Sequence, residues 1–177
     1  MDSPTLDMKI NGLFLRTVDG GKCGAVFSDN EVYRYHLWRQ WETGAGRCCF
    51  ILLNPSTATE AKLDPTVLRC LSFAVHWGYN AVDILNLFAL RSTNPKKLYG
   101  HGDPVGERND EVIRRVAERA GQIIYAWGNH GELNGRAKAV RRLLDDMKPY
   151  ALAITGEGHP KHPLYMKKTT KPFLLED

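Results

Sequence analysis

The sequence predicts an α/β protein in which a central, mostly parallel four-stranded sheet lies between two layers of helices, a three-layer α/β/α arrangement with an N-terminal β-hairpin extension. Short apolar runs alternate with segments of helical periodicity, and each run ends at a polar or turn-forming residue. These runs, which we expect to be the central strands, cover residues 48–53, 81–85, 122–127 and 150–155. The alternation of strands and helices predicts a mostly parallel sheet.

The N-terminal extension precedes this pattern. Residues 13–16 and 24–27 flank the turn-like Asp19-Gly20-Gly21 and are predicted to form the hairpin. Aromatic and polar residues then alternate over residues 32–41, which predicts a further strand before the turn at Gly44 to Gly46.

Three helices are predicted between the central strands. The first begins at Pro65 with Asp64 as its N-cap and stops at Gly78. The second runs from Asn109 or Asp110 to Ala120, and the third covers residues 136–148. No repeat or linker interrupts the chain, so we expect residues 1–177 to form a single domain.

Composition restricts the class of protein. The chain is 43% hydrophobic and carries a formal charge of +4, which permits a polyanionic partner without requiring one. It has neither a signal-peptide pattern nor an apolar run near the roughly 20 residues of a membrane span, so a cytoplasmic monomer that avoids membranes is expected. The four cysteines, Cys23, Cys48, Cys49 and Cys70, lack metal-site spacing, so no metal or other cofactor is expected. Cys48 and Cys49 lie within or beside the first central strand, so buried thiols rather than disulfides are expected.

Asn54 ends the first central strand because Pro55 cannot continue a ladder. Its amide could simply cap a turn, or it could position a water or a substrate carbonyl at the edge where α/β proteins bind ligands.

Asn86 ends the second central strand, and its amide offers both donors and an acceptor. It could read the edge of a nucleobase or bond to a neighbouring loop. Phe88 and Tyr79 could stack on the same base, although an apolar core position is the simpler explanation for Phe88.

His159 lies in a Gly- and Pro-rich loop after the last predicted strand, where an imidazole could stabilise developing negative charge. An exposed histidine in a rigid proline loop is the alternative. Candidate phosphate contacts are Ser56, Arg91, Lys161, His162 and Lys167. The motifs of nucleotide hydrolases, dehydrogenases, serine hydrolases and zinc proteases do not occur in the sequence.

Taken in order, these motifs resemble the uracil-DNA glycosylase superfamily over about residues 48–166. Leu52 to Pro55 is similar to its Gly-x-Asn-Pro motif, and Asp83 to Asn86 resembles the strand that reads the pyrimidine. Ala126 to Gly128 and His159 to Pro163 resemble its third and last motifs. The resemblance implies that Asn54 orients water, Asn86 reads the base and His159 stabilises the departing base. Leucine at position 52 and the pair Lys161-His162 depart from the superfamily pattern.

In closer detail the whole chain resembles the domain of unknown function 1643 family of bacterial and phage proteins. The motifs that carry this resemblance are residues 54–58, 64–66, 77–79, 86–89 and 162–165.

The leading hypothesis is therefore an N-glycosylase that releases a modified or damaged base from DNA, without a cofactor. Two alternatives stay open. The pocket could bind a nucleic acid or nucleotide without cleaving it. The chain could instead be a transferase acting on a hypermodified base, with Asp64 or Asp83 as its base.

Overall fold

The computed structural model describes residues 6–10 and 12–176, and within these residues the strands form a single nine-stranded sheet. The spatial order is β1-β2-β3-β4-β6-β5-β7-β8-β9. The strands are β1 (Leu6–Ile10), β2 (Leu13–Val18), β3 (Cys23–Ser28), β4 (Arg34–Gln40), β5 (Arg47–Leu52), β6 (Ala81–Asn86), β7 (Gln122–Tyr125), β8 (Pro149–Ala151) and β9 (Phe173–Leu174).

The predicted fold class, a central and mostly parallel four-stranded sheet with a hairpin extension, is wrong. Strands β6, β5, β7 and β8 are parallel neighbours, but five of the eight neighbouring pairs in the described sheet are antiparallel. The reason lies in β4, which pairs with β3 on one side and with β6 on the other. The N-terminal strands are thereby part of one mixed sheet rather than an appendage.

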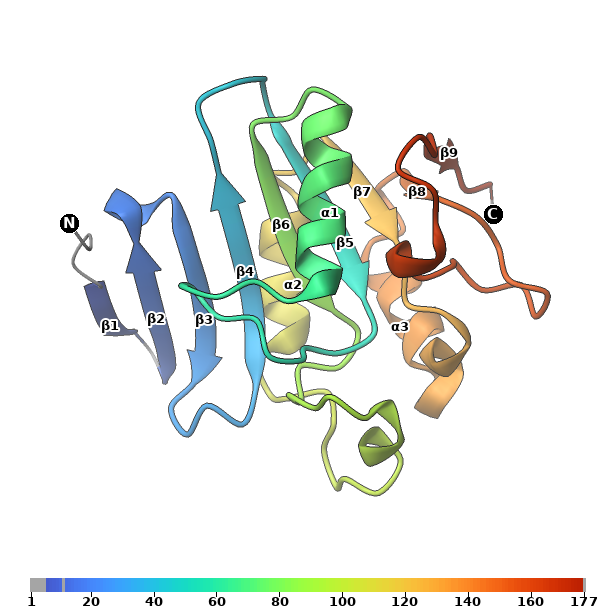
Figure 1. Ribbon diagram of the computed structural model, residues 1–177. Coiled ribbons are helices and arrows are strands. Elements are labelled where there is room, and N and C mark those ends of the chain that lie inside the picture. The colour runs from blue at the N-terminus through green and yellow to red at the C-terminus, as the bar shows by residue number, and fades with distance from the viewer. Residues whose placement is uncertain (1–5, 11, 177) are drawn as a thin grey trace.

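Helices cover both faces of the sheet (Figure 1). Helix α1 (Pro65–His76) packs through Val67, Cys70 and Phe73 against one face, in a cluster with Phe50 of β5. Helices α2 (Asn109–Ala117) and α3 (Arg136–Leu143) pack on the opposite face. None of the helices among the described residues has the length and apolar character required to cross a membrane.

The start of α1 agrees with the sequence prediction. Asp64 has an extended backbone, its Oδ1 accepts a hydrogen bond from the Val67 N–H at 2.9 Å, and Pro65 occupies the first turn. An N-cap carboxylate is favoured there because the first amides of a helix lack internal partners. Asp64 is therefore the N-cap of α1.

Other boundaries differ from the predictions. Helices α2 and α3 end earlier than predicted, and β8 is only three residues long. Ile154 instead forms an isolated bridge with Pro160, so a loop follows β8. Three of the four cysteines (Cys48, Cys49 and Cys70) are buried, Cys23 is half-buried, and all four are free thiols.

Candidate functional site

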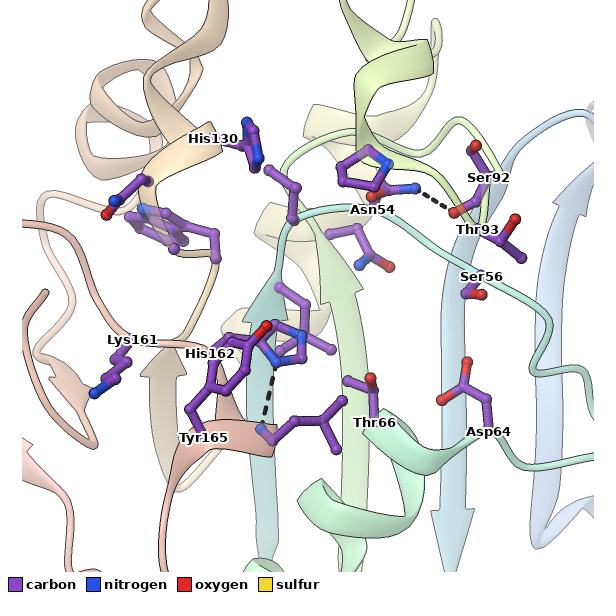
Figure 2. Close-up of a pocket in the computed structure, with 18 of the residues that line it drawn as sticks. Asn54, Ser56, Asp64, Thr66, Ser92, Thr93, His130, Lys161, His162 and Tyr165 are labelled. Carbon is purple, nitrogen blue, oxygen red and sulfur yellow. Dashed lines mark hydrogen bonds between the residues drawn. The ribbon is translucent and has the colours of Figure 1, made fainter.

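A cavity of about 580 Å³ opens at the carboxyl ends of β5 and β6, beside the N-terminus of α1 (Figure 2). Its size falls within the range of small-molecule sites. Polar side chains from six segments of the chain line it. They are Arg34, Asn54, Ser56, Asp64, Thr66, Asn86, Ser92, Thr93, Asn129, His130, Thr155, Lys161, His162 and Tyr165.

Asn54 is held at the cavity by its amide nitrogen. Nδ2 donates to the carbonyls of Pro55 at 3.0 Å, Ser92 at 2.9 Å and, more weakly, Leu90 at 3.4 Å. These bonds tie the turn after β5 to the segment after β6 and determine which way the amide points. Oδ1 accepts no hydrogen bond from the described residues, so it remains available as an acceptor in the cavity.

Asn86 has a fixed backbone and an unpaired side chain. Its carbonyl accepts a hydrogen bond from Nδ2 of the buried Asn109 at 3.0 Å, and the neighbouring Leu87 carbonyl accepts from Asn109 and from Arg136 Nε. The Asn86 side chain is only 1% exposed, and neither Nδ2 nor Oδ1 has a partner among the described residues. A buried amide in this state costs about 1–3 kcal/mol for each unpaired group.

His162 is a partly buried imidazole in the cavity wall. Its Nδ1 accepts a hydrogen bond from the Leu164 N–H at 3.3 Å and caps the short helix η4 (Pro163–Tyr165). Burial lowers the pKa of His162, although the charge of Asp64 opposes that shift. With Nδ1 as an acceptor, the neutral ring carries its proton on Nε2 and can donate from there.

Arg34 and Asp64 supply charges to the same cavity. Arg34 is 2% exposed; its Nη1 donates to the Ala58 carbonyl at 2.8 Å, while its Nε has no partner among the described residues. Burial lowers the pKa of Arg34 to about 10, and the negative charge of Asp64 partly offsets this. Asp64 is the one acidic residue that lines the described cavity.

The structure brings half of the predicted site residues together. Those that line the cavity are Asn54, Asn86, Ser56, Lys161 and His162.

The other predicted site residues lie elsewhere. Phe88 is fully buried in the core beneath α2 and α3, and Arg91 donates to the Glu31 carbonyl and lies over the Phe27 ring. Tyr79 precedes β6 and bonds to Gln122 at the start of β7, so it lies at the opposite end of the sheet. Lys167 is exposed and does not line the cavity.

His159 lies beside a neighbouring cavity, where its Nδ1 is 3.5 Å from Glu132 Oε1. Asp83, a candidate base in the transferase hypothesis, is also remote from the main cavity. It accepts hydrogen bonds from His36 and Arg47 on the face of the sheet that α2 covers.

Sequence reasoning missed His130, Tyr165 and the hydroxyl pair Ser92 and Thr93 as cavity residues. A signal existed for His130, because Trp127-Gly128-Asn129-His130 follows the end of β7, at the same sheet edge as Asn54. No group of three or more histidine, cysteine, aspartate or glutamate side chains in the described part of the chain could hold a metal ion.

Comparison with known protein families matches residues 34–164 to the family described as "Protein of unknown function (DUF1643)". The chain belongs to this family. The match begins at β4 and ends in η4, so it contains every residue named above as lining the cavity except Tyr165, which follows the last matched residue directly. Neither the curated proteins nor the solved structures contain a match to this chain.

Proposed function

We propose that the cavity binds a nucleobase through Asn86 and that this family member hydrolyses the N-glycosidic bond of that base. The observation that carries the proposal is the buried, unpaired amide of Asn86 at a ligand-sized cavity. A ligand that donates to Oδ1 and accepts from Nδ2 would remove the cost of both unpaired groups. The Watson–Crick edge of a pyrimidine places such a donor and acceptor side by side, whether the ring is plain or modified.

Asn54 supports a hydrolytic reaction rather than binding alone. Three carbonyls hold its Nδ2, which leaves Oδ1 as an acceptor in a fixed position. An acceptor of this kind can hold a water molecule by one O–H and direct its lone pair at the glycosidic carbon. An amide cannot remove a proton from water, so bond breaking must be driven from the side of the departing base.

His162 is the residue that we assign to the departing base. A neutral imidazole with its proton on Nε2 can donate a hydrogen bond to the oxygen on which negative charge develops. The geometry favours His162 over His159, because His162 lines the cavity and His159 faces Glu132 outside it. The resemblance of the motif order to the uracil-DNA glycosylase superfamily suggested this reaction, and we move the proposed histidine role from His159 to His162.

The proposed step is balanced as a hydrolysis. The bond between C1′ of the sugar and the base nitrogen breaks, and its electron pair leaves with the base. A water oxygen forms the new bond to C1′, and the proton that this water loses is matched by the one that the departing base gains. Asn54 orients the water, while Asn86 and His162 stabilise the base as it acquires charge.

The test is a screen for free base by liquid chromatography and mass spectrometry. Substrates are nucleosides, nucleotides and DNA oligomers that carry uracil, cytosine or 5-hydroxymethyluracil. We expect release of one base, with at least a hundredfold lower rate for Asn86→Asp and His162→Ala and a change of less than threefold for the control His159→Ala. If the protein bound a base but left every glycosidic bond intact, the hydrolase proposal would be wrong and the cavity would be a binding site without catalysis.

A further inference from the structure

The cavity has two chemically different walls (Figure 2). Ser56, in the turn after β5, and Asp64, at the N-terminus of α1, lie on one side, and Thr66 in the first turn of α1 lies between Asp64 and His162. His130, Lys161, His162 and Tyr165 lie on the opposite side. The first wall mixes donors and acceptors, whereas the second presents the cationic Lys161 and two imidazoles.

Arg34 makes the first wall incomplete without a ligand. It lines the cavity, it is 2% exposed, and its Nε–H has no partner among the described residues. Within the described part of the chain, its side chain makes one hydrogen bond, from Nη1 to the carbonyl of Ala58 between β5 and α1, and this bond leaves Nε unpaired. A buried donor of this kind is stabilised by an acceptor from a bound molecule.

The charge of Asp64 restricts which chemical group could accept a hydrogen bond from Arg34. One of its carboxylate oxygens caps α1, and Oδ2 accepts no hydrogen bond from the described residues. A phosphate or carboxylate near Arg34 would also lie near this negative charge, and like charges repel strongly where water is scarce. Neutral hydroxyl groups meet no such penalty, because each can accept from Arg34 and donate to Asp64. The Ser56 and Thr66 hydroxyls extend the same pattern.

A pair of adjacent hydroxyls is the group that this wall fits best, and in a nucleoside that pair is the 2′,3′-diol of ribose. In ribose the diol forms one edge of the sugar, while the base and the 5′-carbon are attached to the two carbons that flank the ring oxygen. With the diol against Arg34 and Asp64, the base and the 5′-phosphate point towards the other side of the cavity. That side contains His162 for the base and Lys161 and His130 for a phosphate.

We propose that the substrate is a single pyrimidine ribonucleoside 5′-monophosphate, held by its diol at Arg34 and Asp64 and by its phosphate at Lys161 and His130. This inference rests on the proposed function, since it takes Asn86 as the reader of the base. The cavity volume of about 580 Å³ suits one small ligand. Arg91 and Lys167, basic residues expected along a nucleic-acid path, lie away from the cavity.

Isothermal titration calorimetry on the full chain tests the inference. The ligands are uridine and cytidine 5′-monophosphates, their 2′-deoxy counterparts, the unphosphorylated nucleosides and a single-stranded deoxyoligonucleotide that contains uracil. We expect one ribonucleotide to bind at least tenfold more tightly than its deoxy form and about tenfold more tightly than its nucleoside. The oligonucleotide should bind more weakly than the monomer.

Asp64→Asn is the informative variant, because asparagine keeps the helix cap and replaces the Oδ2 acceptor by a donor. It should keep the wild-type melting temperature within about 2 °C and reduce the ribose-to-deoxyribose preference to less than threefold. Asp146→Asn, an exposed carboxylate that pairs with Arg114 outside this cavity, is the matched control and should keep the full preference.

Three results overturn the inference. Equal or tighter binding of deoxyribonucleotides or of the oligonucleotide would refute the ribose assignment while leaving base recognition by Asn86 standing. An unchanged preference in Asp64→Asn would refute the role of Asp64. Failure of every ligand to bind would remove the proposed function together with this inference.

Discussion

Asp83 and Asn86 lie three residues apart on β6, and both side chains are almost completely buried. Asp83 points to the face of α2 and is fully paired, with His36 Nε2 at 2.8 Å and Arg47 Nε and Nη2 at 2.7 and 2.8 Å. Asn86 lies at the opposite face, at the cavity, and its amide is unpaired. A buried polar group whose bonds are complete stabilises the fold, whereas one whose bonds are missing indicates a place for a ligand.

The largest expected effect on the free energy of unfolding comes from removing the paired carboxylate of Asp83. Asp83→Ala leaves Arg47 and His36 without their shared carboxylate and should lower the free energy of unfolding by about 3 kcal/mol, measured by urea denaturation. Asp146→Ala, which removes the exposed partner of Arg114, is the control and should change stability little. Equal losses in the two variants would contradict a structural role for Asp83.

Removing the unpaired amide of Asn86 should have the opposite effect on stability. Asn86→Leu removes two unsatisfied buried atoms and should raise the free energy of unfolding by about 1 kcal/mol, while base binding falls at least tenfold. The matched control is Asn109→Leu, which deletes the donor to the Asn86 and Leu87 carbonyls and should lose about 2 kcal/mol. A large loss of stability in Asn86→Leu would mean that this amide supports the fold.

A smaller effect should appear in the pH dependence of stability. Burial alone would raise the pKa of Asp83, but the hydrogen bonds from His36 and Arg47 outweigh it and hold that pKa below its usual value. The stabilisation from Asp83 is therefore complete above the unfolded-state pKa of about 3.9 and is lost as the pH falls through the lower folded-state value. The stability difference between wild type and Asp83→Asn should shrink between pH 5 and pH 3 in denaturant titrations. A constant difference would contradict the depressed pKa.

The sequence allowed parts of this picture to be predicted, because the signals were local. Asp64 and Pro65 predicted the start of α1, and Pro55 located the end of β5. The sheet as a whole was predicted incorrectly, because pairing of β4 with β6 joins residues more than 40 positions apart and leaves no local pattern. The two-residue strand β9 is likewise defined only by its pairing with β8.

The dependence on long-range pairing also explains why only some of the predicted site residues line the cavity. Asn54 and Asn86 follow parallel neighbours, so their place at one edge was predictable from strand order. Tyr79 precedes β6, and the same rule would have placed it at the far edge. Regular strand alternation would place Phe88 on the same face as Asn86, two residues earlier, but the chain bends after β6 and Phe88 packs with Leu87 in the opposite cluster. No local pattern in the sequence indicates that bend.

The Asn86 amide is central to the proposed ligand site, and the signal of its side-chain NH₂ group in a ¹⁵N-resolved NMR spectrum tests that role directly. Asn86→Leu assigns the signal by its disappearance. On titration with uridine or cytidine 5′-monophosphate, we expect this NH₂ pair to shift downfield in proportion to saturation, because Nδ2 gains the acceptor that it lacks in the free protein. Saturating binding of the nucleotides that leaves the Asn86 signal unmoved would contradict the account.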